Sequence, residues 1–154
     1  MPYTTFHIPK SILRHVLSTK YNHWDEYDLS CNRTKIKIPY NTIYKIYKLT
    51  NLNIPISNND NTYHYIKYWI KTKYTISNHN DGCKLTIIIY LKKNKSIKDL
   101  FYIDNKPVTE DVWSNNSDTY GALAMWNTDA NNQGPEHYGH IIGNGQRDIL
   151  CLFL

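Results

Sequence analysis

The sequence has no apolar run of the length that a membrane helix needs, which is roughly 20 residues. Its first residues, MPYTTFHIPK, also lack the basic-then-apolar layout of a secretion signal. The chain of 154 residues is long enough to bury its own core, and no linker composition divides it. We therefore expect a single domain over residues 1–154, with an intracellular, cytoplasmic location and no membrane partner.

Cysteine is scarce, and no Cys-x-x-Cys pair occurs. The three cysteines, Cys31, Cys83 and Cys151, are an odd number at wide spacing, which argues against a zinc or thioredoxin-type site. The Gly-rich run 139–145 lacks the GxxxxGK[ST] pattern of a phosphate loop, and no GxSxG motif is present. The motifs thus predict no metal and no cofactor.

Positive charge is almost missing from one part of the chain. Residues 107–154, the acidic tail, contain one cation, Arg147, against six acidic residues, whereas residues 1–106, the basic body, contain every lysine. The tail also holds five of the six glycines. The basic body could bind phosphate backbones, or the two regions could attract each other within the fold or between copies. A third interpretation is that the charges simply solvate the surface.

Aromatic residues are abundant, with 14 tyrosines and four tryptophans. Tyr and Trp are enriched at protein interfaces, because they bury a large area at low entropic cost. Asn, Ile, Lys and Tyr all have A/T-rich codons, so their abundance also indicates an A/T-rich genome. Codon bias alone is an alternative explanation for the tyrosines.

Hydrophobic periodicity predicts an α+β fold with an antiparallel sheet or a sandwich of hairpins. An N-terminal helix is expected over about 9–20, where Pro9 suits the first turn. Shorter helices are expected over 42–50, capped by Asn41, and from Ser96 through Phe101. Residues 42–50 are also rich in strand formers, so a strand is the alternative there. Residues 2–8 could form a short strand or an arm, and 34–40 is a predicted edge strand. Residues 114–135 are predicted to be a loop that GALAMW interrupts.

Two hairpins are predicted from alternating apolar residues on either side of a turn. The first joins 63–76 to 83–93 through NHNDG at 78–82. The second joins 137–142 to 147–154 through GNG at 143–145.

The weak candidates for catalysis lie in the acidic tail: His137, His140, Glu136 and Asp129. Two histidines with carboxylates could bind a metal or transfer protons. However, strand residues three apart point to opposite faces, so His137 and His140 should diverge. Ordinary hydrogen-bonding histidines are the simpler interpretation.

A second candidate surface is the alternating segment that begins at Tyr63. It would place aromatic and basic side chains on one strand face, as single-strand nucleic-acid binders do: Tyr65, Lys67, Trp69, Lys71 and Lys73. A solvated sheet face with cross-strand aromatic pairs would show the same pattern.

The sequence favours a non-enzymatic structural protein that associates with itself. We expect a viral source with an A/T-rich genome, and a virion, matrix or occlusion-body component as the concrete form. A basic single-stranded nucleic-acid-binding protein is the alternative, and a small nuclease using the tail histidines is third.

Overall fold

The computed structural model describes residues 2–56, 61–108, 110–113, 116–127 and 134–154. They form two antiparallel sheets, two short helices and a 3-10 turn, η1 (Glu110–Trp113), which confirms the broad α+β prediction. Among the described residues, no helix is long and apolar enough to cross a membrane.

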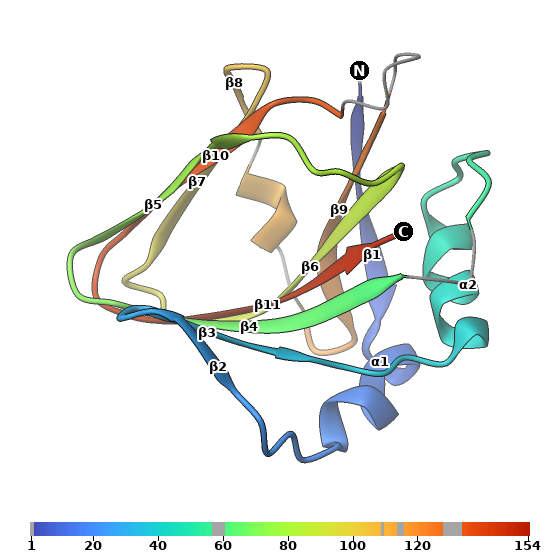
Figure 1. Ribbon diagram of the computed structural model, residues 1–154, viewed down its shortest axis with the longest axis horizontal. Coiled ribbons are helices and arrows are strands. Elements are labelled where there is room, and N and C mark those ends of the chain that lie inside the picture. Colours follow the sequence, from blue (N-terminus) through green and yellow to red (C-terminus); the bar gives the residue numbers. More distant parts are fainter. Residues whose placement is uncertain (1, 57–60, 109, 114–115, 128–133) are drawn as a thin grey trace.

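The larger sheet has seven strands and the smaller sheet has four. In spatial order the larger sheet contains β1 (Tyr3–Pro9), β9 (Thr119–Trp126), β6 (Leu85–Lys93), β11 (Gly145–Phe153), β4 (Thr62–Ile70), β3 (Cys31–Lys35) and β2 (Asp25–Asp28). The smaller sheet contains β5 (Lys73–His79), β10 (His137–Ile142), β7 (Lys98–Ile103) and β8 (Lys106–Pro107). Figure 1 shows the two sheets facing each other, with the helices outside the larger one.

The chain crosses from one sheet to the other at the turns where hairpins were predicted, so both predicted hairpins are wrong. Strands β5 and β6 flank the NHNDG turn, but β5 pairs with β10, whereas β6 pairs with β9 and β11. Strands β10 and β11 flank the GNG turn, but β10 pairs with β5 and β7. The predicted strand 63–76 is likewise two strands, β4 and β5, in different sheets. Alternation identifies strands, but it does not identify their partners.

The two helices cover the outer face of the larger sheet. Helix α1 (Lys10–Ser18) is shorter than the predicted 9–20, because Pro9 still belongs to β1 and Thr19 is extended. Helix α2 (Tyr40–Leu49) confirms the second predicted helix, although Pro39 rather than Asn41 precedes it. Apolar side chains from both helices pack against β6 and β11 in one core cluster, including Leu13, Val16, Ile43, Ile46, Ile87 and Leu150.

Four other local predictions have mixed outcomes. The helix predicted from Ser96 is wrong, because strand β7 (Lys98–Ile103) occupies that segment. The GALAMW segment, which interrupts the predicted loop over 114–135 and had no assigned structure, forms most of the buried strand β9. The strand predicted over 2–8 is confirmed as β1, and β3 covers only the beginning of the predicted strand 34–40.

A second core cluster fills the space between the sheets. It is apolar in its main part, and includes Ile88, Phe101, Ile141 and Ile149. Charged and hydroxyl-bearing side chains also enter this space, notably Arg147, Tyr68 and Tyr90, all of which are buried. Burying a charge is costly unless the charge is paired, so Arg147 needs an oppositely charged partner in this space.

Candidate metal centre

Two histidines and an aspartate meet at one end of the smaller sheet. His79 ends β5 and His137 begins β10, and the antiparallel register places the two residues opposite each other. Their rings are edge to face, with centroids 4.3 Å apart. Asp81 lies in the turn after β5, and its carboxylate reaches back to both rings. These three residues are called the triad below.

The triad's ligand atoms converge closely. Asp81 Oδ1 lies 3.4 Å from His79 Nε2 and 3.5 Å from His137 Nε2. One ligand atom from each residue lies within 4.8 Å of the other two. This spacing is what a single ion can span after a small adjustment of the side chains.

In both histidines, the hydrogen bond made by Nδ1 determines that Nε2 faces Asp81. His79 Nδ1 lies 2.7 Å from the Ser77 carbonyl oxygen, and His137 Nδ1 lies 3.1 Å from the Pro135 carbonyl oxygen. A carbonyl oxygen only accepts, so each Nδ1 carries the proton that it donates. In a neutral ring Nε2 then presents a lone pair towards Asp81. Such a backbone carbonyl behind the ring is the usual support of a metal-binding histidine.

The electrostatics of the triad favour a cation between its members. Burial would raise the pKa of Asp81, but hydrogen bonds with His137 and His79, and then with Thr86, hold that pKa well below its usual value. The pKa of His79 is raised, chiefly by its hydrogen bond to Asp81 and against the effect of burial. The Asp81 carboxylate is therefore stabilised in its charged form, which is the form that binds a divalent cation.

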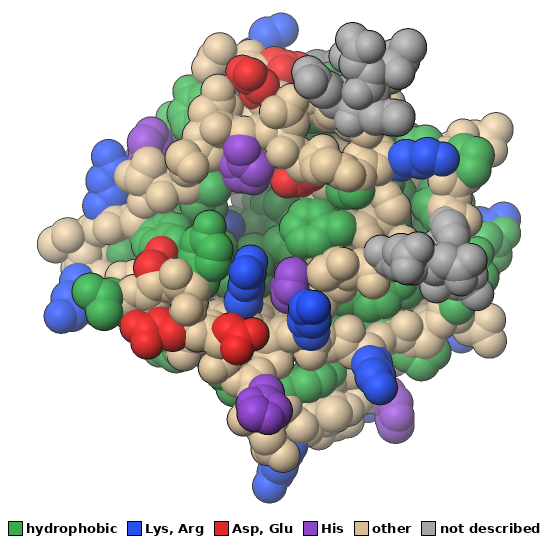
Figure 2. Space-filling view, viewed as in Figure 1, with side chains coloured by type: hydrophobic (Ala, Val, Ile, Leu, Met, Phe, Trp, Pro, Cys, Tyr) green, Lys and Arg blue, Asp and Glu red, His purple; other side chains and the backbone are tan. Residues whose placement is uncertain are grey.

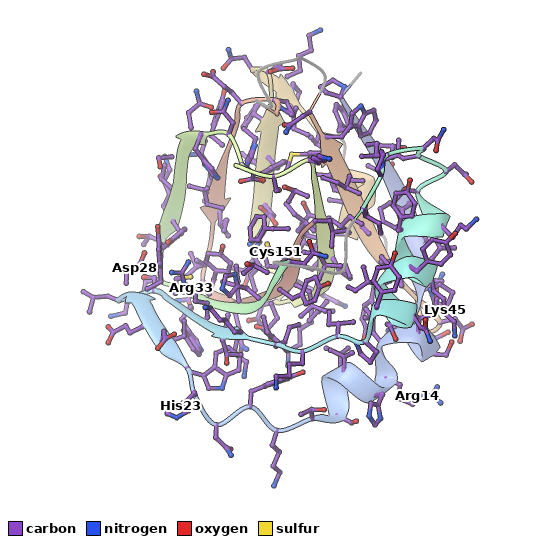
Figure 3. The ribbon with its side chains drawn as sticks, turned by 45° about the vertical axis from the view of Figure 1, so that its right-hand side comes forward. Arg14, His23, Asp28, Arg33, Lys45 and Cys151 are labelled. Atoms are coloured by element: carbon purple, nitrogen blue, oxygen red, sulfur yellow. The ribbon has the colours of Figure 1, made fainter. Side chains whose placement is uncertain are left out.

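Asp81 and His137 line a small cavity together with Cys83 and Thr86, whereas His79 lines a separate groove with a volume of about 540 Å³. Its lining includes His79 at one end, Tyr74 on β5, Tyr68 on β4, and Asp28 and Arg33 on the β2–β3 hairpin. Figure 2 shows the molecule hollowed here, with histidine, apolar and charged side chains around the opening. Figure 3 shows Asp28 and Arg33 near one another on that hairpin and Cys151 in the middle of the molecule.

Arg147 lies deep in the molecule beside this groove. Its guanidinium is 4.8 Å from the centre of the Tyr68 ring, which lines the groove. The side chains of Arg147 and Asp99 are only 2% and 3% exposed, and Arg147 Nε donates to Asp99 Oδ2 over 2.6 Å. Burial opposes the charge, but Asp99 holds the pKa of Arg147 above its ordinary value. Arg147 Nη1 is buried and has no hydrogen-bond partner among the described residues.

Cys151 is buried in the core cluster between the sheets. Burial raises the pKa of its thiol to about 12, and the charges of Arg147 and Asp81 both act on it, the first lowering and the second raising that pKa.

No family model matches the chain, and no curated protein matches it either. The functional argument accordingly rests on geometry.

The structure separates the four tail residues that were the weak catalytic candidates. His137 belongs to the triad, whereas His140 lies on the opposite face of β10 beside Tyr102 and Tyr138, as the strand periodicity predicts. Glu136 accepts a hydrogen bond from Asn78 over 3.1 Å and is not in the triad. Asp129 lies outside the described residues.

The five candidate nucleic-acid-binding residues do not share one strand. Tyr65, Lys67 and Trp69 lie on β4, Lys71 follows that strand, and Lys73 begins β5 in the other sheet. Lys67 packs over the rings of Trp24 and Tyr65, as in a solvated face with aromatic packing. Nucleic-acid binding itself stays a prediction.

Sequence reasoning missed His79, Asp81 and Arg147. The signal for His79 and Asp81 was the His-x-Asp pair inside the NHNDG segment, which was interpreted only as a turn. The signal for Arg147 was its position as the single cation of the acidic tail. Neither signal is specific until the pairing of β5 with β10 is known.

Proposed function

We propose that the protein is a non-haem Fe(II)-dependent oxygenase that uses a 2-oxo dicarboxylic acid, such as 2-oxoglutarate, as its co-substrate. The observation that carries the proposal is the triad of His79, Asp81 and His137, with both Nε2 atoms and Asp81 Oδ1 directed to one point. Two histidines and one carboxylate with open positions are typical of non-haem Fe(II) oxygenases.

The number of ligands supports an open, reactive centre. A structural zinc site is closed by four protein ligands. Only three metal-binding side chains gather here among the described residues. Cys83 is nearby in sequence, but its Sγ contacts Thr86 Oγ1, 3.2 Å away, rather than the triad. Three protein ligands leave the remaining positions to the co-substrate and to O2.

Arg147 supports the choice of a dicarboxylic acid. Guanidinium groups bind carboxylates through paired, charge-assisted hydrogen bonds. Arg147 Nη1 has no partner among the described residues, although it is buried beside the groove that His79 lines. The 2-oxo acid end of the co-substrate would face the triad, while its distal carboxylate would pair with Arg147.

The electron balance explains why such a co-substrate is needed. Reduction of O2 takes four electrons, of which hydroxylation of a substrate C–H bond provides two. Oxidative decarboxylation of the 2-oxo acid provides the other two and yields CO2 and the shortened dicarboxylic acid. The bound Fe(II) would supply O2 activation. The protein would orient the co-substrate through the buried Arg147 and keep water away from it.

The test is release of CO2 from 2-oxoglutarate labelled at its first carbon. We expect release that requires both Fe(II) and O2, is lost in Asp81→Ala, and persists in His140→Ala, whose side chain lies on the opposite face of β10. Release that is absent from the wild-type protein under Fe(II), O2 and reductant would overturn the proposal. Hydrolytic activity with zinc in place of this reaction would do the same.

Self-association remains a separate proposal that an oxygenase activity does not exclude. It is supported by the composition and by tyrosines on the surface, where Tyr27, Tyr40 and Tyr44 are exposed. Sedimentation at low and high salt, with and without single-stranded RNA, tests it and the nucleic-acid alternative together. Large species without RNA would favour assembly, and a monomer that shifts only with RNA would favour nucleic-acid binding.

A further inference from the structure

We propose that Thr86 is a positioning residue that holds Asp81 as a ligand through one oxygen only, and thereby keeps a metal position open for O2. The inference rests on the proposed metal centre. It concerns a residue outside the triad, the second residue of β6, which is buried.

The two oxygens of the Asp81 carboxylate have different surroundings. Oδ1 faces Nε2 of both His79 and His137. Oδ2 accepts a hydrogen bond from Thr86 Oγ1 over 2.7 Å. An ionised carboxylate only accepts, so the hydroxyl proton of Thr86 points to Oδ2. This bond draws Oδ2 away from the centre and leaves Oδ1 for the metal.

Thr86 is well suited to hold the carboxylate because its own backbone is fixed. It pairs with Met125 of β9 on one side and with Phe153 of β11 on the other. Its β-branched side chain also has few rotamers. Asp81, in contrast, lies in the turn between β5 and β6, outside the strand ladders. The sheet therefore restrains the turn carboxylate through one hydroxyl group.

Cys83 lies next to this hydroxyl. Its Sγ lies 3.2 Å from Thr86 Oγ1. Sγ also lies 3.5 Å from the Leu85 carbonyl oxygen, to which the thiol donates its proton. Cys83 thus touches the same hydroxyl without touching the carboxylate, which makes it a matched control position.

The consequence for catalysis follows from the number of metal positions. His79, Asp81 and His137 would each hold a bound Fe(II) through one atom, which would leave room for the co-substrate and for O2. A second oxygen from Asp81 on the metal would take up part of that room.

The test compares Thr86→Val, which keeps the shape and removes the donor, with Thr86→Ser, which keeps the hydroxyl, and with the control Cys83→Ala. Co(II) is titrated anaerobically into each metal-free protein, because the intensity of its visible absorption reports coordination number. Outer-shell partners of metal ligands are worth about 10- to 100-fold in metal affinity or activity. We expect Thr86→Val to bind Co(II) about 10- to 100-fold more weakly or with an altered spectrum, and the other two variants to stay within about threefold of wild type with its spectrum.

Each outcome is decisive. Wild-type affinity and spectrum in Thr86→Val would overturn the positioning role while leaving the metal centre intact. Wild-type protein that binds no Co(II) would overturn the centre itself, and the inference with it. A purely structural role would lower the thermal midpoint of the metal-free protein without changing affinity or spectrum, and that result also overturns the inference. If Thr86→Val does not fold, Thr86→Ala removes the same donor with a smaller side chain and is read by the same criteria.

Discussion

Replacing Arg147 by methionine removes a charge from the interior and leaves its partner behind. Asp99 is then a buried carboxylate whose remaining hydrogen bond, among the described residues, comes from Trp113 Nε1 over 2.9 Å. Removing one member of a buried ion pair typically costs about 3–5 kcal/mol. Domains are stable by only about 5–15 kcal/mol, so the variant loses a large share of its stability. With a urea dependence of about 1–3 kcal/mol per molar, the unfolding midpoint falls by about 2 M.

The double variant Arg147→Met/Asp99→Leu separates the two contributions. Replacing a buried ion pair by apolar residues of similar volume is often neutral or stabilising. We therefore expect the double variant to recover most of the lost stability in urea unfolding followed by tryptophan fluorescence. It should still lose saturable 2-oxoglutarate binding, because the distal carboxylate has lost its partner. A single variant that costs less than about 1 kcal/mol, or a double variant less stable than the single one, would refute the reasoning.

Two further predictions concern stability. In the metal-free protein, the raised pKa of His79 contributes stability that is fully present below about pH 6.5 and is lost as the pH rises through the folded-state value. The lowered pKa of Asp81 contributes stability that is present above about pH 4 and is lost as the pH falls through its folded-state value. The contribution of this pair to stability should therefore be largest between about pH 4 and 6.5. Asp81→Asn should flatten the profile of urea midpoints against pH. An unchanged profile would contradict the assignment. Separately, Gly121→Ala should destabilise the protein by about 1–3 kcal/mol or more, because its Cβ would collide with the backbone carbonyl of Val112. The control Gly82→Ala, where no heavy atom lies within 4 Å, should change urea unfolding little, and equal effects in both variants would count against the packing described.

Local patterns predicted several strands because strand periodicity depends on neighbouring residues alone. Alternating apolar residues located β4, β6, β10 and β11, and Pro9 lies directly before α1. The partners of these strands depend on where the turns direct the chain. The turn at 143–145 uses Gly143 and Gly145 at φ of 129° and 145°, and it carries the chain into the other sheet rather than back along β10.

The candidate site was less accessible to sequence reasoning than the strands. His79 and His137 become neighbours only through the pairing of β5 with β10, which no short-range signal specifies. GALAMW was missed as a strand because its small residues lack the β-branched and aromatic character that marks most strands. Arg147 is separated from Asp99 by 48 positions, so their burial together follows from the sandwich and not from local pattern.

Anaerobic calorimetric titration of Fe(II) into metal-free protein tests the central claim most directly. The account predicts one Fe(II) per chain, with binding abolished or severely weakened in His79→Ala, Asp81→Ala and His137→Ala. It predicts unchanged binding in His140→Ala, because that ring lies on the opposite face of β10. Absence of binding in the wild-type protein, or equal loss in His140→Ala and His137→Ala, would contradict the assignment of the triad as a metal centre.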